Sequence, residues 1–258
     1  MTNEPSVRSE QHGVVVTLTL NRPARLNALD SEMASALLDA IERIEGNASV
    51  RVVVLRGEGR SFCAGGDVAA MHAHRDDLPA FIERTINPFH ACILSLKRLR
   101  KPVVACVHGA LAGGGFSLAM ACDFVVAARN ARFVVAYPKL GAPADGGLSF
   151  FLVQRLGSAR GLEALTTGGQ FSAEQALQLG LVNRLADEDS LQQATEQWVG
   201  EMLALPEQSL RELKGLVAAQ SVIALEGQLQ REKAAFLRCS ATPDFVARVA
   251  AFAQRRPA

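Results

Sequence analysis

Apolar and polar residues follow two rhythms in the first part of the chain. Residues 14–20 and 50–56 are short runs rich in β-branched side chains, which predict strands. Between them, after Asp30, apolar residues recur every three or four positions, so we expect an amphipathic helix to begin there. A strand–helix–strand unit therefore opens the fold.

Two glycine-rich turns follow apolar strands in the middle of the chain. Residues 61–67 (SFCAGGD) come after the second strand, and residues 108–115 (HGALAGGG) lie between a strand-like run at 102–107 and a helix-like run at 116–122. Glycine has no Cβ, so a ligand can approach the backbone, and the first N–H groups of a helix are unpaired. Neither turn has the spacing of the common phosphate-binding loops. Together they predict paired backbone donors for an oxyanion.

The remaining pattern is a helix-rich continuation of the same fold. Residues 71–78 are polar and predict a loop, residues 79–99 a long helix, and residues 123–128 and 132–136 two more strands. A short extended piece is expected at 180–185. Further helices are expected at residues 149–156, 158–167, 172–179, 189–205, 209–220, 223–238 and 242–254. No linker separates the last helices, so they should pack on the core or on a neighbouring subunit.

Composition narrows the class of protein. The 258 residues are 49% hydrophobic with a formal net charge of +1, which allows a large core and gives no attraction to nucleic acid or to an anionic membrane. The five cysteines are odd in number and form no C-x-x-C, which favours reduced thiols and a cytoplasmic location. No signal peptide is expected at the N-terminus. Residues 102–128 carry little charge, but His108, the glycines and Asp123 indicate a buried strand–helix–strand rather than a membrane span.

Three motifs carry a family resemblance. Residues 62–67 (FCAGGD) and 108–115 resemble the paired oxyanion-hole motifs of the crotonase family (the enoyl-CoA hydratase/isomerase superfamily), and residues 20–29 (LNRPARLNAL) resemble its N-terminal signature. The resemblance runs from about residue 14 to residue 256. It implies an α/β fold, a crotonase-like ββα spiral with a helical C-terminal region. The spiral core with the acyl-CoA site would occupy residues 1–200, and a helical trimerisation region residues 201–258.

The resemblance also implies the catalytic groups. It places the backbone N–H groups of Gly66 and Gly114 around the thioester carbonyl of an acyl-CoA, and it makes Asp145 the candidate base, since a carboxylate in an apolar pocket gains basicity. Hydratases of the family use two glutamates. This chain has Ser117 in place of one and no acid near Tyr137 for the other. Because hydration needs one group to activate water and one to deliver a proton, an enoyl-CoA isomerase with Asp145 acting alone is favoured.

Other chemistries remain open. Enoyl-CoA hydration is the first alternative, with Asp145 and a water or His90 replacing the glutamate pair. His90, Asp145 and Tyr137 also fall at the positions of the His base, the nucleophilic Asp and a Trp in the family's 4-chlorobenzoyl-CoA dehalogenase, so a dehalogenase or thioester hydrolase is the third hypothesis. A lone helical His is more often a packed residue. The hypothesis from another class is a non-catalytic protein with the same fold: an acyl-CoA binder would keep Gly66 and Gly114 and be indifferent to Asp145, whereas the net charge of +1 and the absence of a long basic run argue against an RNA binder.

Binding residues follow from the same resemblance. The expected contacts to coenzyme A are Arg22, Ala24, Arg25, Leu26, Ala64, Gly65, Asp67, Val68, Phe252 and Arg255, and those to the acyl group are Met71, Ser117 and Tyr137. Coenzyme A enters as part of the substrate, and no separate cofactor is expected. The histidines outside these motifs show no metal-ligand spacing, so no metal is expected. The expected partners are an acyl-CoA and further copies of the chain, in a homotrimer or a hexamer, without nucleic acid or membrane.

Overall fold

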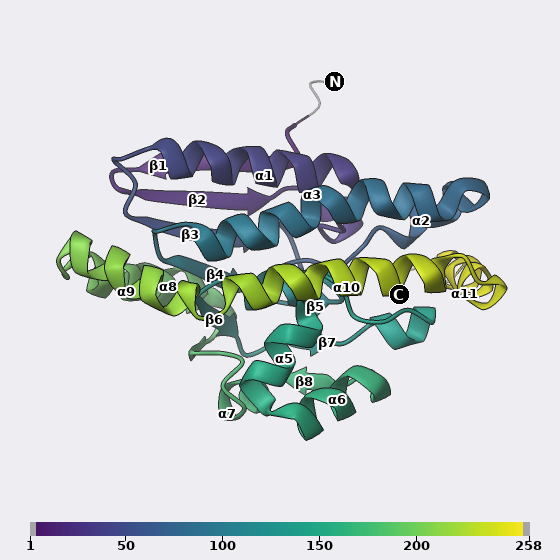
Figure 1. The fold of residues 1–258 in the computed structure, drawn as a ribbon. Coiled ribbons are helices and arrows are strands. Elements are labelled where there is room, and N and C mark those ends of the chain that lie inside the picture. The colour runs from purple at the N-terminus through teal and green to yellow at the C-terminus, as the bar shows by residue number, and fades with distance from the viewer. Residues whose placement is uncertain (1–3, 255–258) are drawn as a thin grey trace.

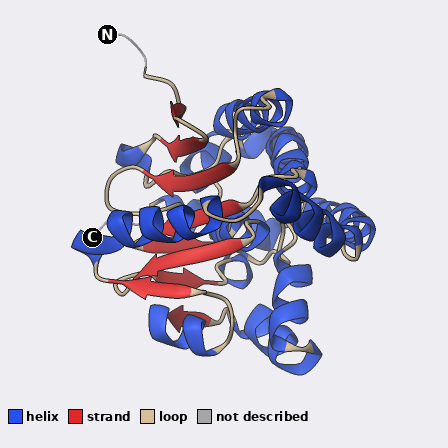
Figure 2. Cartoon of the chain, turned by 90° about the vertical axis from the view of Figure 1, so that its left-hand side faces the viewer, coloured by secondary structure: helices blue, strands red, loops and turns tan. Residues whose placement is uncertain are grey.

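A six-stranded sheet forms the centre of the molecule (Figure 2). The computed structural model describes residues 4–254. The first two strands are antiparallel and all the other neighbours are parallel. In spatial order the strands are β1 (Val7–His12), β2 (Val15–Leu20), β3 (Val52–Gly57), β4 (Val103–Val107), β6 (Phe124–Ala128) and β9 (Arg184–Ala186).

The parallel strands are buried on both faces, which explains their near-continuous apolar sequences. Every residue of β4 is buried. Along β3, Val53 and Leu55 belong to the main core, whereas Val52 and Val54 face a second apolar cluster on the opposite side of the sheet. Residues from α8 (Leu191–Leu203) complete that second cluster. The period of two along a strand thus divides the core into two layers.

A second, three-stranded sheet extends the spiral next to the glycine-rich turns. It contains β5 (Ala110–Ala112), β7 (Arg132–Val134) and β8 (Gln170–Ser172) in that order. Of these strands only β7 was expected. β1 was not predicted either, and the extended piece predicted at residues 180–185 begins four residues before β9 and overlaps it at residues 184–185. These strands are short, and pairing with neighbours rather than local sequence preference makes them extended.

Eleven α-helices surround the two sheets in the described chain (Figure 1). Besides α8, they are α1 (Ser31–Gly46), α2 (Val68–Ala73), α3 (Leu78–Arg98), α4 (Gly114–Ala121), α5 (Leu148–Leu156), α6 (Ser158–Thr167), α7 (Ala173–Gln178), α9 (Glu207–Ala219), α10 (Val222–Ser240) and α11 (Pro243–Ala253). As predicted, Asp30 caps α1, because its side chain accepts a hydrogen bond from the amide of Met33.

The predicted loop at residues 71–78 is wrong. This stretch contains the end of α2, a 3-10 helix (Arg75–Asp77) and the first residue of α3. Asp67 caps α2 by accepting a hydrogen bond from the Ala70 amide at 3.0 Å, and Met71 is buried. A cap and one buried side chain therefore hold a polar segment in a helix that its composition does not favour.

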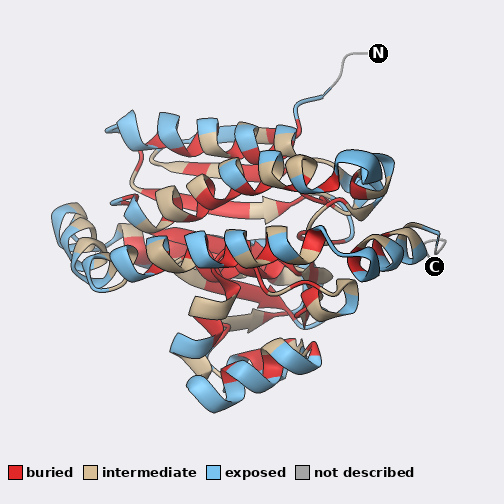
Figure 3. Ribbon diagram, turned by 45° about the vertical axis from the view of Figure 1, so that its right-hand side comes forward, coloured by how far each residue is buried: buried red, intermediate tan, exposed pale blue. Residues whose placement is uncertain are grey.

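The last two helices pack on the chain's own core, which is one of the two placements that the sequence predicted. α10 lies along α3, and α11 lies against α2 (Figure 1). Ion pairs join α10 to α3 at Lys233–Glu83 (3.2 Å) and Glu226–Arg98 (2.9 Å). The buried side of α10 faces inward and its outer side is exposed (Figure 3). Across residues 4–254, no helix combines the length and the apolar character needed to cross a membrane.

Candidate active site

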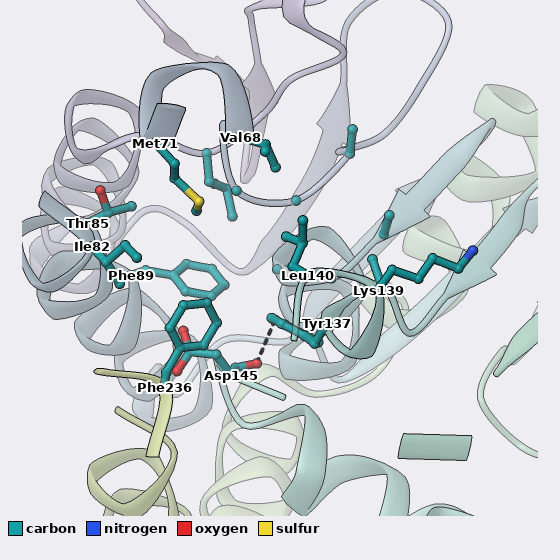
Figure 4. A pocket seen from close by; sticks show the side chains of 18 of the residues that line it. Val68, Met71, Ile82, Thr85, Phe89, Tyr137, Lys139, Leu140, Asp145 and Phe236 are labelled. Carbon is teal, nitrogen blue, oxygen red and sulfur yellow. Dashed lines mark hydrogen bonds between the residues drawn. The ribbon is translucent and has the colours of Figure 1, made fainter. Parts of the chain in front are cut away.

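A cavity of about 260 Å³ opens between the two glycine-rich turns and helix α3 (Figure 4). Gly66, Gly114 and Asp145 all lie on its wall, although they are far apart in the sequence. The rest of the wall is mainly apolar: Leu29, Ala64, Gly65, Val68, Met71, Ile82, Thr85, Ile86, Phe89, Ala112, Gly113, Val134, Ala136, Tyr137, Lys139, Leu140, Phe236 and Phe252. The chain thus brings two backbone turns and one carboxyl group to the same apolar space.

The two glycine-rich turns are in direct contact. The Cys63 amide donates to the Ala110 carbonyl at 3.2 Å, and the Ala112 amide donates to the Cys63 carbonyl at 3.1 Å. A Cβ on Gly115 would lie 2.1 Å from the Cys63 carbonyl oxygen, and one on Gly65, which has φ +94°, would lie 2.5 Å from the Ala112 carbonyl oxygen. Only glycine permits so close an approach. The glycines are therefore required for the two turns to share one wall.

The amides of Gly66 and Gly114 make no hydrogen bond to any residue that the structure describes. Gly114 is the first residue of α4, so its N–H precedes the hydrogen-bonded part of the helix. Leu29 pairs with the residues on either side of Gly66, donating to Gly65 and accepting from Asp67, which leaves the Gly66 N–H unused. Both donors border the cavity and can bind a ligand oxygen there.

Asp145 meets His90 at the cavity wall. Their side chains are 2.7 Å apart, Nε2 to Oδ1, and both residues are 5% exposed. His90 comes from α3, whereas Asp145 comes from the loop that precedes α5. Asp145 lines the cavity and His90 lies behind it. The histidine can therefore hold the carboxyl group in place without itself bordering the ligand space.

Two hydroxyl groups hold the backbone of Asp145. The Tyr137 hydroxyl donates to the Asp145 carbonyl at 2.9 Å (Figure 4). Ser117 Oγ donates to the same carbonyl at 2.6 Å, and the two hydroxyls are 3.0 Å apart. Burial, and then the charge of Asp145, raises the pKa of Tyr137 well above its usual range, so the phenol keeps its proton as a donor. Ser117 does not line the cavity, so its expected place in the acyl pocket is not where the structure puts it.

Of the residues expected to contact coenzyme A, about half lie at the cavity. On its wall are Ala64, Gly65, Val68 and Phe252, together with Met71 and Tyr137 from the expected acyl pocket. Asp67 is the cap of α2 and binds Arg22 at 3.1 Å, and Arg22 also binds Asp30 at 2.9 Å. Ala24, Arg25 and Leu26 lie in or just after a short 3-10 helix (Pro23–Arg25) and do not border the cavity. Arg255 lies outside the described residues.

The comparisons with known proteins decide the family. A family model described as "Enoyl-CoA hydratase/isomerase" matches residues 10–258. The chain belongs to this family. It is an acyl-CoA enzyme of the enoyl-CoA hydratase/isomerase superfamily, and both the crotonase resemblance and the predicted fold class are confirmed.

Relatives within the enoyl-CoA hydratase/isomerase family differ in the names of their reactions. The chain is 34% identical over 246 residues to 1,2-epoxyphenylacetyl-CoA isomerase from Escherichia coli (94% of this chain, 93% of the relative). It is 29% identical over 239 residues to 4-chlorobenzoyl coenzyme A dehalogenase-2 from an Arthrobacter species (92% and 87%). The solved structure of enoyl-CoA hydratase from Bacillus halodurans matches with a TM-score of 0.90 at 25% identity, covering 95% of this chain and 99% of that one.

One buried acid beside the site, Glu232, was not among the residues predicted from the sequence. Glu232 on α10 is 4% exposed and accepts hydrogen bonds from the amides of Gly147 (2.6 Å) and Ser149 (3.1 Å). Burial, and then the charge of Asp145, raises the pKa of Glu232 to about 8. In the sequence it stands between Arg231 and Lys233 and resembles solvated charge.

A periodic signal for Glu232 was nevertheless present. The buried side of α10 includes Leu225, Leu229, Glu232 and Phe236, which follow helical spacing, so a glutamate interrupts an otherwise apolar stripe. Phe236, and Phe89 on α3, were also missed, and both line the cavity. An acid on a core-facing stripe is the pattern that could have revealed this position.

His90, Asp145 and Glu232 are the three groups near the cavity that could hold a metal ion. Their ligand atoms lie within 4.8 Å of one another and all three residues are buried. In this structure, however, His90 and Asp145 bind each other, and Glu232 accepts two backbone amides. The ligand atoms of these three side chains are thus engaged in hydrogen bonds within the protein. That no metal binds here stays a prediction.

Proposed function

We propose that the enzyme moves the double bond of an enoyl-CoA from position 3 to position 2 through an enolate. The observation that carries this proposal is the position of Asp145. Within residues 4–254, it is the only carboxylate on the wall of a cavity that also presents the Gly66 and Gly114 amides. A base and a pair of oxyanion donors in one apolar space are the parts that proton abstraction next to a thioester requires.

In this mechanism the thioester oxygen accepts hydrogen bonds from the N–H groups of Gly66 and Gly114. Asp145 takes a proton from C2, and the negative charge moves onto the thioester oxygen as a dienolate forms. The same carboxyl group then returns its proton to C4, which leaves the double bond between C2 and C3. The loss of either amide donor is expected to cost about 3 kcal/mol of transition-state stabilisation.

The neighbours of Asp145 support this single-carboxylate route. His90 holds the carboxylate, while Ser117 and Tyr137 hold its backbone carbonyl. The aromatic rings of Phe89 and Phe236 line the space beside it (Figure 4). These walls limit the access of water, so the protonated carboxyl group returns its proton to carbon rather than to solvent.

Hydration, the first alternative, has less support from the cavity wall. It needs a second acid or base that reaches the substrate. Ser117 is fully buried and its hydroxyl is engaged with Asp145, and Glu232 does not border the cavity. Water activation would therefore depend on Asp145 alone.

A nucleophilic role for Asp145 is the second candidate, because its contact with His90 favours it. In that chemistry the carboxylate would displace halide from an aryl-CoA, and His90 would activate the water that hydrolyses the resulting ester. The relative named as a chlorobenzoyl-CoA dehalogenase makes this substrate worth testing. Tyr137 occupies the position at which the resemblance to the dehalogenase implies a Trp. This difference weakens the match to a dehalogenase and favours the isomerase.

The test uses the purified protein with three substrates: 3-hexenoyl-CoA, crotonyl-CoA and 4-chlorobenzoyl-CoA. We expect 3-hexenoyl-CoA to gain the absorbance of a conjugated thioester without a change in mass. Addition of water to crotonyl-CoA without this reaction would replace the isomerase with a hydratase, and chloride release would replace it with a dehalogenase. Binding of all three without turnover would indicate an acyl-CoA-binding protein.

We also propose that the chain assembles into a homotrimer or a dimer of trimers in the cytoplasm. Apolar side chains on α9 support an assembly: Leu213, Leu216 and Val217 are 57%, 65% and 68% exposed. Ile223, at the start of α10, is 83% exposed. A second copy of the chain could cover these residues. The five cysteines are free thiols, which supports the compartment.

A further inference from the structure

Glu232 is a buried carboxyl group that the proposed mechanism does not use. It reaches from α10 to the start of α5, where its two oxygens accept the amides of Gly147 and Ser149, and Oε1 also accepts the Ser149 hydroxyl. Gln228, one turn earlier on α10, donates to the same hydroxyl at 2.8 Å. Helix α10 is thereby attached to the backbone just after Asp145.

The same carboxyl group lies within 4.8 Å of Asp145 and His90, measured between their ligand atoms. At this distance in a buried site, two carboxylates interact strongly, since little water lies between them to screen their charges. Glu232 therefore acts on Asp145 in two ways. It fixes the backbone beyond it, and its charge state changes the energy of the Asp145 carboxylate.

We propose that Glu232 is a positioning residue for Asp145, which anchors the loop after Asp145 and, when ionised, strengthens Asp145 as a base. This inference rests on the proposed proton transfer. Proton abstraction from C2 moves negative charge from Asp145 to the thioester oxygen, and the return of the proton to C4 moves that charge back. In both transition states Asp145 therefore carries less negative charge than in the enzyme–substrate complex, so a second negative charge next to it lowers both barriers measured from that complex.

The surroundings of Glu232 determine the direction of the pH effect. The ionisable groups that face it are His90 from α3, Asp145 from the loop and Tyr137 from the 3-10 helix (Tyr137–Leu140). Its neighbour Lys233 is paired with a glutamate of α3. Burial and the charge of Asp145 raise the pKa of Glu232 to about 8, so the group is neutral at pH 7 and ionises as the pH rises through 8.

The experiment measures kcat for double-bond migration from pH 6 to pH 10. We expect kcat of the wild-type enzyme to rise about fivefold through pH 8, as the nearby charge appears. Glu232→Gln should remove this rise. At pH 7, where the wild-type carboxyl group is neutral, the amide resembles it, so kcat and KM of the variant should stay within about twofold of the wild-type values. The matched control is Glu226→Gln on the same helix, where the side chain is 49% exposed; it should leave the rise in place. A rise of the same size in Glu232→Gln would overturn the proposal.

Two further measurements separate this inference from the proposed function. Ser149→Ala should move the inflection to higher pH, since the Ser149 hydroxyl bond favours the ionised form of Glu232. Infrared spectra should contain a protonated carboxyl band at pH 6 that disappears by pH 10 and that Glu232→Gln lacks. If the band behaves so while 3-hexenoyl-CoA does not react, the isomerase fails and only the ionisation of Glu232 beside Asp145 stands. If the enzyme is active and no such band is found, the assignment of Glu232 fails.

Discussion

The two ends of the cavity are built in different ways. At the end where we propose that the thioester binds, Gly66 and Gly114 offer backbone amides, and the position of each amide is set by a short continuous turn and by hydrogen bonds to neighbouring backbone. At the other end, Asp145 depends on side chains from α3, α4, α10 and the 3-10 helix that begins at Tyr137. The glycine end is thus formed by short continuous segments of the sequence. The Asp145 end forms only when distant elements pack together.

This difference separates binding from chemistry. In the proposed mechanism, backbone donors hold the thioester whatever its acyl group, so the glycine end would suit any acyl-CoA reaction. The side-chain network around Asp145 would then decide which bond is made or broken, because small changes there alter the base, its orientation and its electrostatic surroundings. Variants at the Asp145 end should therefore change the reaction, whereas variants at the glycine end should weaken all reactions alike.

The largest effect is expected from Asp145→Asn. The amide is nearly isosteric but accepts no proton, so kcat for double-bond migration should fall about 10³-fold. Binding of a saturated acyl-CoA, measured by calorimetry, should change little, since the amide donors at Gly66 and Gly114 remain. Full activity of this variant would show that Asp145 is not the catalytic base. The proposed division between a binding end and a chemical end of the cavity would then be wrong.

Gly115→Ala tests the opposite end. The added Cβ would lie 2.1 Å from the Cys63 carbonyl oxygen, so the two turns must separate and the donor geometry is lost. We expect kcat to fall about 10²-fold with every substrate that reacts. The control is Gly200→Ala in α8, where a Cβ would meet nothing within 4 Å and where alanine favours the helix. Circular dichroism and thermal unfolding should first establish that both variants are folded; an active, folded Gly115→Ala variant would contradict the prediction.

The same division explains what the sequence could predict. The glycine turns, the strands before them and the helix capped by Asp30 follow local rules, so pattern and spacing located them. The short strands β5 and β8 were missed because the pairing of distant segments makes them extended. The helix at residues 68–73 was missed because its cap and its one buried residue, Met71, became visible only with the tertiary structure.

The network around Asp145 shows this limit most clearly. His90 and Asp145 were each identified as candidates, but nothing in the sequence states that they are 2.7 Å apart. Ser117 was assigned to the acyl pocket from its position after the glycines, whereas it faces the back of Asp145. Glu232 was hidden by its charged neighbours. Long-range packing determines all of these contacts, and they could not be predicted from this one sequence considered without an alignment.

A smaller effect is expected from His90→Gln, which distinguishes the two roles of Asp145. If Asp145 shuttles a proton, glutamine can still donate a hydrogen bond to the carboxylate, and kcat should fall about tenfold or less. If Asp145 is a nucleophile, the loss of the base that activates water should leave an ester on Asp145. Mass spectrometry of the intact protein after a brief reaction with 4-chlorobenzoyl-CoA would detect that ester. Its presence would assign Asp145 as a nucleophile rather than a proton shuttle. His12→Gln on β1 is an exposed control.

The smallest single effects are expected from the two hydroxyl groups behind Asp145, and their combination is informative. In Tyr137→Phe or Ser117→Ala the Asp145 carbonyl keeps one of its two hydroxyl donors, so each variant should lose about 1 kcal/mol of stability and less than threefold in kcat. The double variant leaves the buried carbonyl with only the long bond from the Leu148 amide (3.4 Å), so its loss of stability should exceed the sum of the two by about 1 kcal/mol. Urea unfolding of all four proteins measures this coupling. Strict additivity would mean that the two hydroxyls do not share the carbonyl, and the Asp145 end of the cavity would then be less interdependent than its contacts indicate.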